Sequence, residues 1–259
     1  MVLRSGRIFS LAVLLALVVL TYYFIRKAKK ARPKVRSFSA LESLKMAVGR
    51  AAELGRPVMW LTGAAGEGLY GRAGNVTLAA MGVLGYLTSL VVPLKAKLIA
   101  CNAYAEAHPL IEEVMKTEYI RAGKPEMYDA NNVRYSPLWY PYVTAVLGHL
   151  ARERPAAIFF GGVFGHESIV ISEPAGVIGS FNVAGTISAN QMGYFAATCE
   201  DWFFGDEMYA IGAFLSRDPY QMGSLTSGDI LKWSLLVLIL AGILLSSLGS
   251  NIIVQLLAS

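Results

Sequence analysis

The sequence predicts an α/β domain with a mostly parallel sheet and helices on both faces, flanked by a transmembrane helix at each end of the chain. Between residues 58 and 215, short apolar runs alternate with longer helical stretches, which is the pattern of a parallel sheet covered on both faces. Residues 8–25 are uncharged and strongly apolar, and no charged residue follows Lys232. The alternation indicates a doubly wound, Rossmann-like domain, and the two apolar runs indicate membrane helices.

The first apolar run is long enough to cross a membrane. A helix over residues 8–25 would be roughly 27 Å long, close to the thickness of the hydrocarbon core of a bilayer. Seven Lys and Arg residues follow this run directly, against two before it. Basic residues are retained on the cytoplasmic side, so this asymmetry predicts a cytoplasmic location for the chain that follows. Because no small-residue cleavage site follows the run, we expect a retained anchor and not a signal peptide.

The basic excess of the chain lies beside this first run. The chain has 23 Lys and Arg against 18 Asp and Glu, which gives a net charge of +5. Nine of the basic residues lie within residues 1–36, which contain no acidic residue, so the remainder carries 14 basic and 18 acidic residues. The flanking charges, which include Arg26, Lys27, Lys29 and Lys30, are expected to contact anionic lipid headgroups. This distribution argues against nucleic-acid binding.

A basic linker at residues 26–38 leads into the predicted cytoplasmic domain, residues 39–229. Ser39 and Glu42 form a capping box at the start of an amphipathic helix, and Gly55 marks its end. The predicted strands are residues 58–62, 97–100, 157–160 and 177–184, with a further short one at 202–204. The predicted helices are residues 76–91, 105–122, 137–152, a short helix after Gly165, 188–199 and 206–215. Residues 123–135 are expected to form a loop, with or without a short strand.

The second membrane segment is predicted within residues 230–259. A helix over residues 233–257 would be roughly 37 Å long, enough to cross with tilt. Two spans with a cytoplasmic domain between them place both termini outside. The N-terminal anchor comprises residues 1–25. Neither span carries an ionisable residue, which argues against ion or proton transport. Small residues four positions apart predict helix packing within one chain or between chains. They are Ala12 and Ala16 in the first span and Gly242, Ser246 and Ser250 in the second.

A glycine-rich loop follows the first predicted strand. Its glycines are Gly63, Gly66, Gly68 and Gly71, and the last three have the G-x-G-x-x-G spacing. Such glycines allow a tight turn and close approach of a pyrophosphate to a helix N-terminus. However, Asn102 stands where a ribose-binding carboxylate is expected, and Glu67 would repel phosphate. A turn that only reverses the chain is the favoured interpretation, and a nucleotide-like site is the alternative.

A second glycine loop follows the strand predicted at residues 157–160. Its candidate ligand-binding residues are Gly161, Gly162, His166, Glu167 and Ser168. Ligands of open α/β sheets bind at the C-terminal ends of strands, so the two loops would share a crevice if their strands are neighbours. His166 and Glu167 could act as acid and base or bind a metal, but adjacent residues on a helix point apart and no HExxH motif is present. A capping or hydrogen-bonded structural histidine at the start of the helix is the favoured interpretation.

Acidic residues and cysteines give weaker signals. Four acidic residues lie close together in the sequence: Glu200 and Asp201 are expected to end one helix, and Asp206 and Glu207 to begin the next. Acids in a first turn stabilise a helix through its dipole, and binding of a divalent cation is the alternative. Cys101 and Cys199 lack metal-ligand spacing and are expected to be buried and reduced. No Walker motif, nucleophile elbow, zinc pattern or kinase motif set occurs in the sequence.

Three segments carry a resemblance to a known family. They are residues 50–58 (RAAELGRPV), 151–173 (ARERPAAIFFGGVFGHESIVISE) and 212–225 (GAFLSRDPYQMGSL). Together with the membrane span that follows, they resemble a family of uncharacterised archaeal and bacterial membrane proteins known as a domain of unknown function. The resemblance covers most of residues 40–245. It implies the two-span layout and a prokaryotic source, and it transfers no catalytic residues.

These observations lead to two functional hypotheses. The first is a membrane-anchored, homo-oligomeric scaffold or binding protein that presents a cytoplasmic Rossmann-like domain. The absence of a complete catalytic residue set favours it. The second is a membrane-tethered enzyme or sensor that binds a nucleotide-like small molecule at the C-terminal ends of the strands. The sequence requires no cofactor and contains no metal-binding motif, so the identity of any cofactor stays open.

Overall fold

The structure is a computed structural model that describes residues 8–30, 39–66, 68–71, 74–216 and 219–247. The chain divides into two compact units. One unit comprises residues 1–35 together with 217–259, and the other comprises residues 36–216. The first unit therefore joins the two ends of the chain, and the second is the α/β domain.

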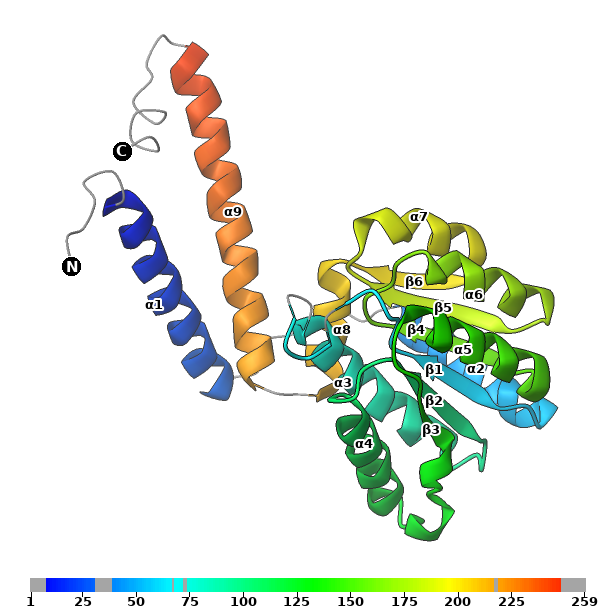
Figure 1. Cartoon of the computed structure of the whole chain (residues 1–259). Helices are drawn as coiled ribbons and strands as arrows, with labels where there is room; N and C mark the ends of the chain where they lie inside the picture. Colours follow the sequence, from blue (N-terminus) through cyan, green and yellow to red (C-terminus); the bar gives the residue numbers. More distant parts are fainter. Residues whose placement is uncertain (1–7, 31–38, 67, 72–73, 217–218, 248–259) are drawn as a thin grey trace. The chain divides into compact units, whose positions relative to one another are not determined.

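The described residues of the α/β domain form a sheet of six parallel strands (Figure 1). In chain order they are β1 (Val58–Leu61), β2 (Leu98–Asn102), β3 (Val133–Tyr135), β4 (Ala157–Gly161), β5 (Phe181–Thr186) and β6 (Asp201–Phe204). Their order across the sheet is β3-β2-β1-β4-β5-β6. Strands β1 and β4 lie at the centre, and every side chain of β1 is buried. The predicted α/β fold with a parallel sheet is confirmed.

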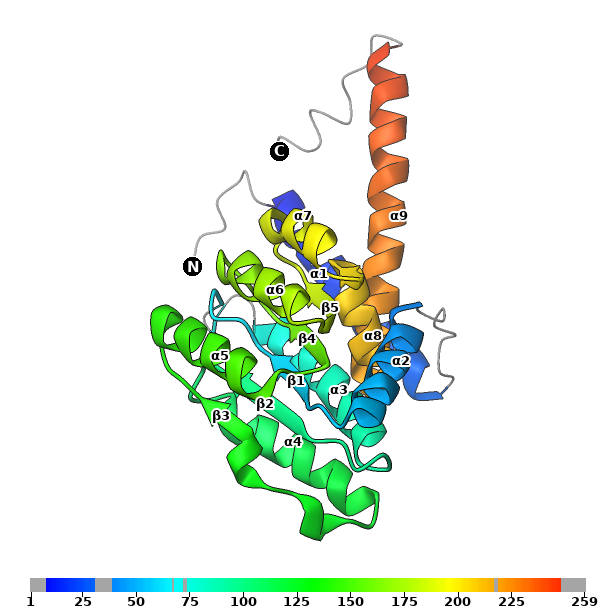
Figure 2. The same ribbon diagram turned by 90° about the vertical axis from the view of Figure 1, so that its right-hand side faces the viewer.

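Helices cover both faces of the sheet, as Figure 2 also shows. One face packs against α2 (Ser39–Leu54), α3 (Gly74–Val91), α4 (His108–Arg121) and α8 (Asp206–Ser216). The other packs against α5 (Trp139–Glu153), α6 (Glu167–Val177) and α7 (Ala189–Thr198). Strand β1 illustrates the alternation of side chains along a strand, because Val58 and Trp60 belong to the first core and Met59 and Leu61 to the second.

Two segments differ from the expected element bounds. Strand β5 was expected over residues 177–184, but it occupies Phe181–Thr186 because α6 continues to Val177 and Gly179 turns the chain with a φ of 77°. The expected loop at residues 123–135 contains two short 3₁₀ turns, η1 (Pro125–Met127) and η2 (Ala130–Asn132), before β3. This segment allows β3 to pair with β2 at the edge of the sheet.

The other unit consists, in its described part, of α1 (Ile8–Lys30) and α9 (Pro219–Ser247). The pairing is antiparallel, because Thr21 Oγ1 lies 3.3 Å from Ser227 Oγ while Lys29 Nζ donates a hydrogen bond of 2.7 Å to Tyr220 Oη. Helix α9 begins well before the predicted second span, so residues 219–229, which were expected in the cytoplasmic domain, belong to this helix.

Glycine sets the closest approach of the two helices. A Cβ atom added to Gly223 would lie 2.6 Å from the Cα atom of Ile25. Because Gly223 and Ser227 are four residues apart and both are buried, they form a small-residue face against α1.

Two of the searched helices are long and apolar enough to cross a membrane, namely α3 and α9. Helix α3 is mostly buried in the domain, which explains its composition without a membrane. The apolar window of α9 is not buried at all.

Candidate functional site

The centre of the sheet contains a topological switch point. From β1 the chain moves outward to β2 and β3, and from β4 it moves in the opposite direction to β5 and β6. Strands β1 and β4 are hydrogen-bonded neighbours, with Leu61 opposite Phe160. The two glycine loops therefore leave the sheet side by side at its C-terminal edge. A shared site requires that the strands before the two loops are neighbours, and β1 and β4 are neighbours. Ligands of open α/β sheets bind at such a point.

The two loops touch each other directly. The Ala65 N–H donates to the Val163 carbonyl over 3.4 Å. A Cβ atom added to Gly63 would overlap the Val163 carbonyl oxygen, and one added to Gly162 would overlap that of Thr62. Gly63 also has a φ of 76°, which favours glycine. The close approach of two backbones thus accounts for both glycines without a ligand.

Side chains of the protein itself accept hydrogen bonds from the first loop. Gly63 N–H donates to Tyr142 Oη (3.3 Å) and Gly66 N–H to Tyr104 Oη (2.8 Å). Ala64 N–H donates to Glu167 Oε1 (2.9 Å) and Leu69 N–H to Glu106 Oε1 (3.2 Å). In a phosphate-binding loop such N–H groups face the anion. Here two carboxylates and two phenol oxygens occupy them.

Glu167 connects three segments of the domain. Its side chain is fully buried, and Oε2 accepts a hydrogen bond of 2.6 Å from Trp139 Nε1 at the start of α5. Oε1 accepts from Ala64 in the first loop, as described above. Glu167 lies in the first turn of α6, where a negative charge is favourable. Glu167 takes part in none of the ion pairs among the described residues. Its carboxylate is stabilised by the hydrogen bonds from Ala64 and Trp139.

The residues around Glu167 have separate structural roles. His166 is exposed although Glu167 is buried, which agrees with the expectation that adjacent side chains point apart. His166 is the N-cap residue of α6, but its side chain makes no capping hydrogen bond, so the capping interpretation is wrong. Ser168 is fully buried, and its Oγ donates to Gln191 Oε1 of α7 over 2.5 Å. A Cβ atom on Gly161 would lie 2.9 Å from Trp60 Nε1. The candidate residues of the second loop do not form a hydrogen-bonded acid–base pair among the contacts of the described residues.

The remaining glycines of the first loop differ in environment. Gly68 is buried with a φ of 66°, and an added Cβ would overlap the Glu106 carboxylate. Gly66 and Gly71 are half-buried. The close contact at Gly68 shows that the loop packs on its own chain at this position.

The two tyrosines at the first loop stay protonated at neutral pH. Burial raises the pKa of Tyr104 to about 12, and it raises the pKa of Tyr142 well above the usual value. Sequence reasoning missed four partners of the loops: Tyr104, Glu106, Trp139 and Tyr142. Tyr104 and Glu106 directly follow β2, and Trp139 and Tyr142 follow β3, so the available signal was their place after neighbouring strands.

Metal binding has no support in the described part of the chain, which contains no group of three or more His, Cys, Asp or Glu side chains able to hold an ion. Glu200 and Asp201 have other partners: Glu200 Oε2 accepts from the Asn182 N–H and Asp201 Oδ2 from Ser43 Oγ. Cys101 and Cys199 are free and buried, and burial raises the pKa of each thiol to about 12. Both cysteines are therefore unreactive thiols in the domain core.

The predicted packing residues of the membrane segments differ in exposure where the structure describes them. Ala16 and Ser246 are exposed and Gly242 is half-buried. Ser250 and the side chains of Ala12 and Lys30 lie outside the described residues. The other predicted membrane-surface residues, Arg26, Lys27 and Lys29, are exposed.

A family model described as a domain of unknown function (DUF6754) matches residues 1–257 of the chain. No curated protein and no solved structure matches the chain.

Proposed function

We propose that this chain, which belongs to the family described as a domain of unknown function (DUF6754), is a membrane-anchored scaffold or binding protein. Helix α1 and a second span that begins within α9 would hold an α/β domain at the cytoplasmic face. The assembly would be a homo-oligomer.

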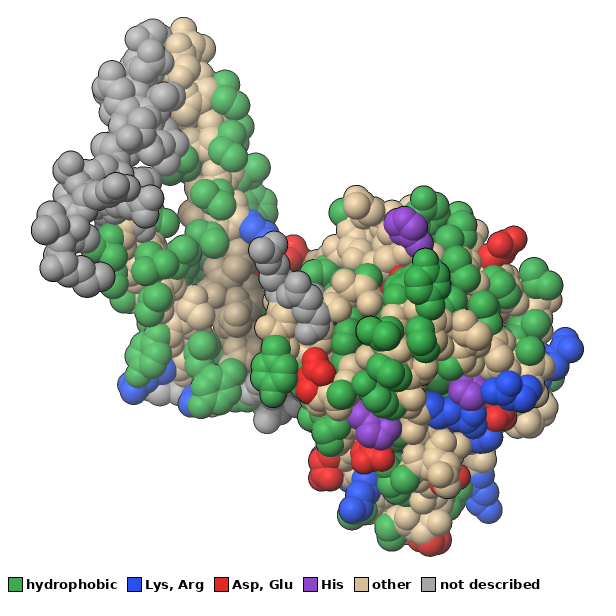
Figure 3. Space-filling model, viewed as in Figure 1, with side chains coloured by type: hydrophobic (Ala, Val, Ile, Leu, Met, Phe, Trp, Pro, Cys, Tyr) green, Lys and Arg blue, Asp and Glu red, His purple; other side chains and the backbone are tan. Residues whose placement is uncertain are grey.

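The observation that carries this proposal is the apolar surface of the helix pair. In α1, Val18 and Val19 are at least 60% exposed, and in α9 Ile243 and Leu244 are exposed to the same degree. Figure 3 shows hydrophobic side chains along both helices of this unit, with Lys and Arg side chains gathered where α1 ends. Contiguous apolar surface of this extent requires a partner such as lipid or protein. A bilayer fits best, because both helices satisfy their backbone hydrogen bonds internally.

The charge distribution supports the orientation. The basic flank after α1 favours a cytoplasmic α/β domain and external termini, and it favours anionic headgroups as a partner. The Arg26 guanidinium lies 5.1 Å from the centre of the Tyr22 ring and Lys27 lies 5.8 Å from that of Phe24. Aromatic side chains followed by basic side chains are typical of a membrane interface.

The second candidate, an enzyme or sensor for a nucleotide-like ligand, is favoured by the strand order. The order 3-2-1-4-5-6 is that of the dinucleotide-binding Rossmann fold, whose ligand lies at the switch point. Against it, the carboxylates of Glu106 and Glu167 already accept from the loop N–H groups, and β2 ends in Asn102 without an acidic residue. A phosphate would have to displace two negative charges. We therefore assign the domain to the Rossmann-like class and favour the scaffold function.

Membrane anchoring is tested by alkaline carbonate extraction of membranes that contain the full chain. We expect the chain to stay in the pellet, and release into the supernatant would overturn the proposal. Orientation is tested with a membrane-impermeant maleimide, since both native cysteines are buried. Ser5→Cys should react in intact cells, whereas Ser37→Cys should react only after permeabilisation. The reverse result would overturn the orientation.

Oligomerisation and ligand binding need separate measurements. Light scattering in detergent should give a protein mass of several times 28.0 kDa, and a mass of one chain would refute the homo-oligomer. A thermal-shift screen with nucleotides should give no stabilisation. A saturable shift that Glu167→Gln changes would favour the second candidate instead.

A further inference from the structure

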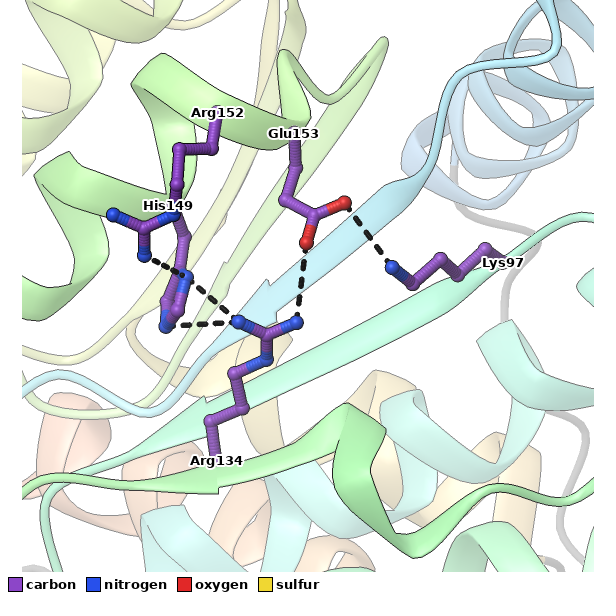
Figure 4. Close-up of polar contacts among 5 residues, drawn as sticks. All are labelled: Lys97, Arg134, His149, Arg152 and Glu153. Atoms are coloured by element: carbon purple, nitrogen blue, oxygen red, sulfur yellow. Dashed lines mark hydrogen bonds and ion pairs between the residues drawn. The ribbon is translucent and has the colours of Figure 1, made fainter.

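We propose that the α/β domain binds an oxyanion, a phosphate-like group, at a basic cluster beside the edge strand β3. The cluster consists of Lys97, Arg134, His149, Arg152 and Glu153 (Figure 4). Lys97 immediately precedes β2, Arg134 lies on β3, and the other three residues lie in the last turns of α5. This cluster is separate from the two glycine loops, and the proposal goes beyond the scaffold function.

Positive charge exceeds negative charge in the cluster. Glu153 is its only acidic member, and its two oxygens are shared between Arg134 Nη2 (3.1 Å) and Lys97 Nζ (3.1 Å). Arg152 has no carboxylate among its hydrogen bonds in the cluster. Three cations thus face one carboxylate, which leaves a net charge of +2 when His149 is neutral.

The two guanidinium groups converge on a single imidazole. Arg134 Nη1 lies 2.8 Å from His149 Nδ1 and 3.3 Å from Nε2, and Arg152 Nη2 lies 3.0 Å from the same Nδ1. A neutral imidazole has one acceptor nitrogen. Two cationic donors therefore share one lone pair, and the cluster contains more donors than acceptors.

One donor of the cluster has no acceptor among the described residues. Arg134 Nε is buried and has no hydrogen-bond partner, while the side chain as a whole is 29% exposed. Buried donors without partners are uncommon in folded proteins and call for an acceptor. An anion with several oxygens could accept from Arg152 and from the Nη groups of Arg134 together, which suits the planar fork of a guanidinium. Arg134 Nε has almost no exposed surface, so a shift of the side chain would be needed for it to donate as well.

The state of His149 agrees with this arrangement. Its pKa is lowered by burial and by the charges of Arg134, Arg152 and Lys97, against the opposite effect of Glu153. A bound anion would oppose the three cations and raise the pKa of His149. Binding should therefore become tighter as the pH falls from 8 to 6.

The test measures sulfate binding to the full chain in detergent by calorimetry at constant ionic strength. Sulfate is a suitable probe because it stays doubly charged across this pH range. We expect saturable binding that Arg152→Gln weakens about tenfold, since a charge-assisted hydrogen bond is lost. His149→Gln should remove the pH dependence. Arg121→Gln is the matched control, because Arg121 is also an exposed arginine in the last turn of a helix, paired with Glu118.

Two results would overturn the proposal. They are absence of saturable sulfate binding by the wild type and equal affinities of Arg152→Gln and Arg121→Gln. If the wild type does not bind sulfate and Arg152→Gln lowers the melting temperature, the cations only stabilise the C-terminal end of α5.

Two further arms distinguish the source of the oxyanion. Inorganic phosphate that competes with sulfate in detergent indicates a free phosphate. Weaker sulfate binding in phosphatidylglycerol nanodiscs than in phosphatidylcholine nanodiscs indicates a lipid headgroup.

Discussion

Replacement of Glu167 by glutamine tests whether its buried carboxylate holds the switch-point loops together. The carboxylate accepts from two donors, Ala64 N–H at 2.9 Å and Trp139 Nε1–H at 2.6 Å. A glutamine amide has one oxygen and one NH₂ group, so one of the two donors would face another donor. The change is nearly isosteric and leaves no cavity.

The expected magnitude follows from the one charge-assisted hydrogen bond that is lost. Such a bond contributes about 1.5–3 kcal/mol, and each kcal/mol corresponds to about 2–4 °C for a domain of this size. Glu167→Gln should therefore lower the melting temperature of the α/β domain by about 3–12 °C. Glu173→Gln is the matched control, because Glu173 is exposed on the same helix.

Thermal unfolding followed by tryptophan fluorescence measures the effect, because Trp60 is fully buried in the domain. Hydrogen exchange supplies a local measurement, since the Ala64 amide should exchange faster in Glu167→Gln than in the wild type. If both glutamate variants melt within about 1 °C of the wild type and Ala64 exchange is unchanged, the carboxylate does not hold the loops and the role assigned to Glu167 is refuted.

Three further predictions use matched pairs or pH. Gly63→Ala should destabilise the domain more than Gly55→Ala, because both positions have positive φ but only Gly63 faces the Val163 carbonyl. If urea unfolding shows that both variants lose the same free energy of unfolding, the contact between the two loops is contradicted. Gly223→Val should abolish oxidative cross-linking of a Thr21→Cys, Ser227→Cys pair, whereas Gly228→Val, which has open space, should not; cross-linking in both variants would refute the described helix contact. The lowered pKa of His149 means that the unfolded chain takes up a proton first as the pH falls. Its contribution to stability should be complete above its usual pKa of 6.5 and decrease below it, and His149→Gln should remove this decrease. The lowered pKa of Glu153, caused mainly by its hydrogen bond to Lys97, adds a second decrease below its usual value of 4.5. A flat stability profile from pH 7 to pH 5 would contradict the assignment for His149.

Much of the fold was predictable from local patterns. The apolar runs at residues 58–62 and 157–160 predicted the two central strands, because a strand buried on both faces must be apolar throughout. The short helix expected after Gly165 is confirmed as α6, which begins at Glu167. The start of β5 was placed too early, since an apolar run such as residues 177–184 does not show by itself where a helix ends and a strand begins.

The partners of the site were not predictable in the same way. The G-x-G-x-x-G spacing of Gly66, Gly68 and Gly71 is compatible with phosphate or with a turn, and the chain contains no local signal that decides between them. The acceptors for this loop come from Tyr104, Tyr142 and other residues more than 30 positions away, as their hydrogen bonds show. Their approach depends on strand order, which short-range periodicity does not contain.

The sequence by itself determined the α/β class, the apolar character of both ends and the confinement of the basic excess to the N-terminal flank. These properties depend on composition and on periodicity along the chain. Only the tertiary structure decided that β1 and β4 are neighbours and that Glu106 and Glu167 occupy the N–H groups of the first loop. It also decided that Arg134 and Arg152 converge on His149. The physical reason is that hydrogen bonds and charges act over a few ångströms in space, and the order of the strands brings distant residues within that range.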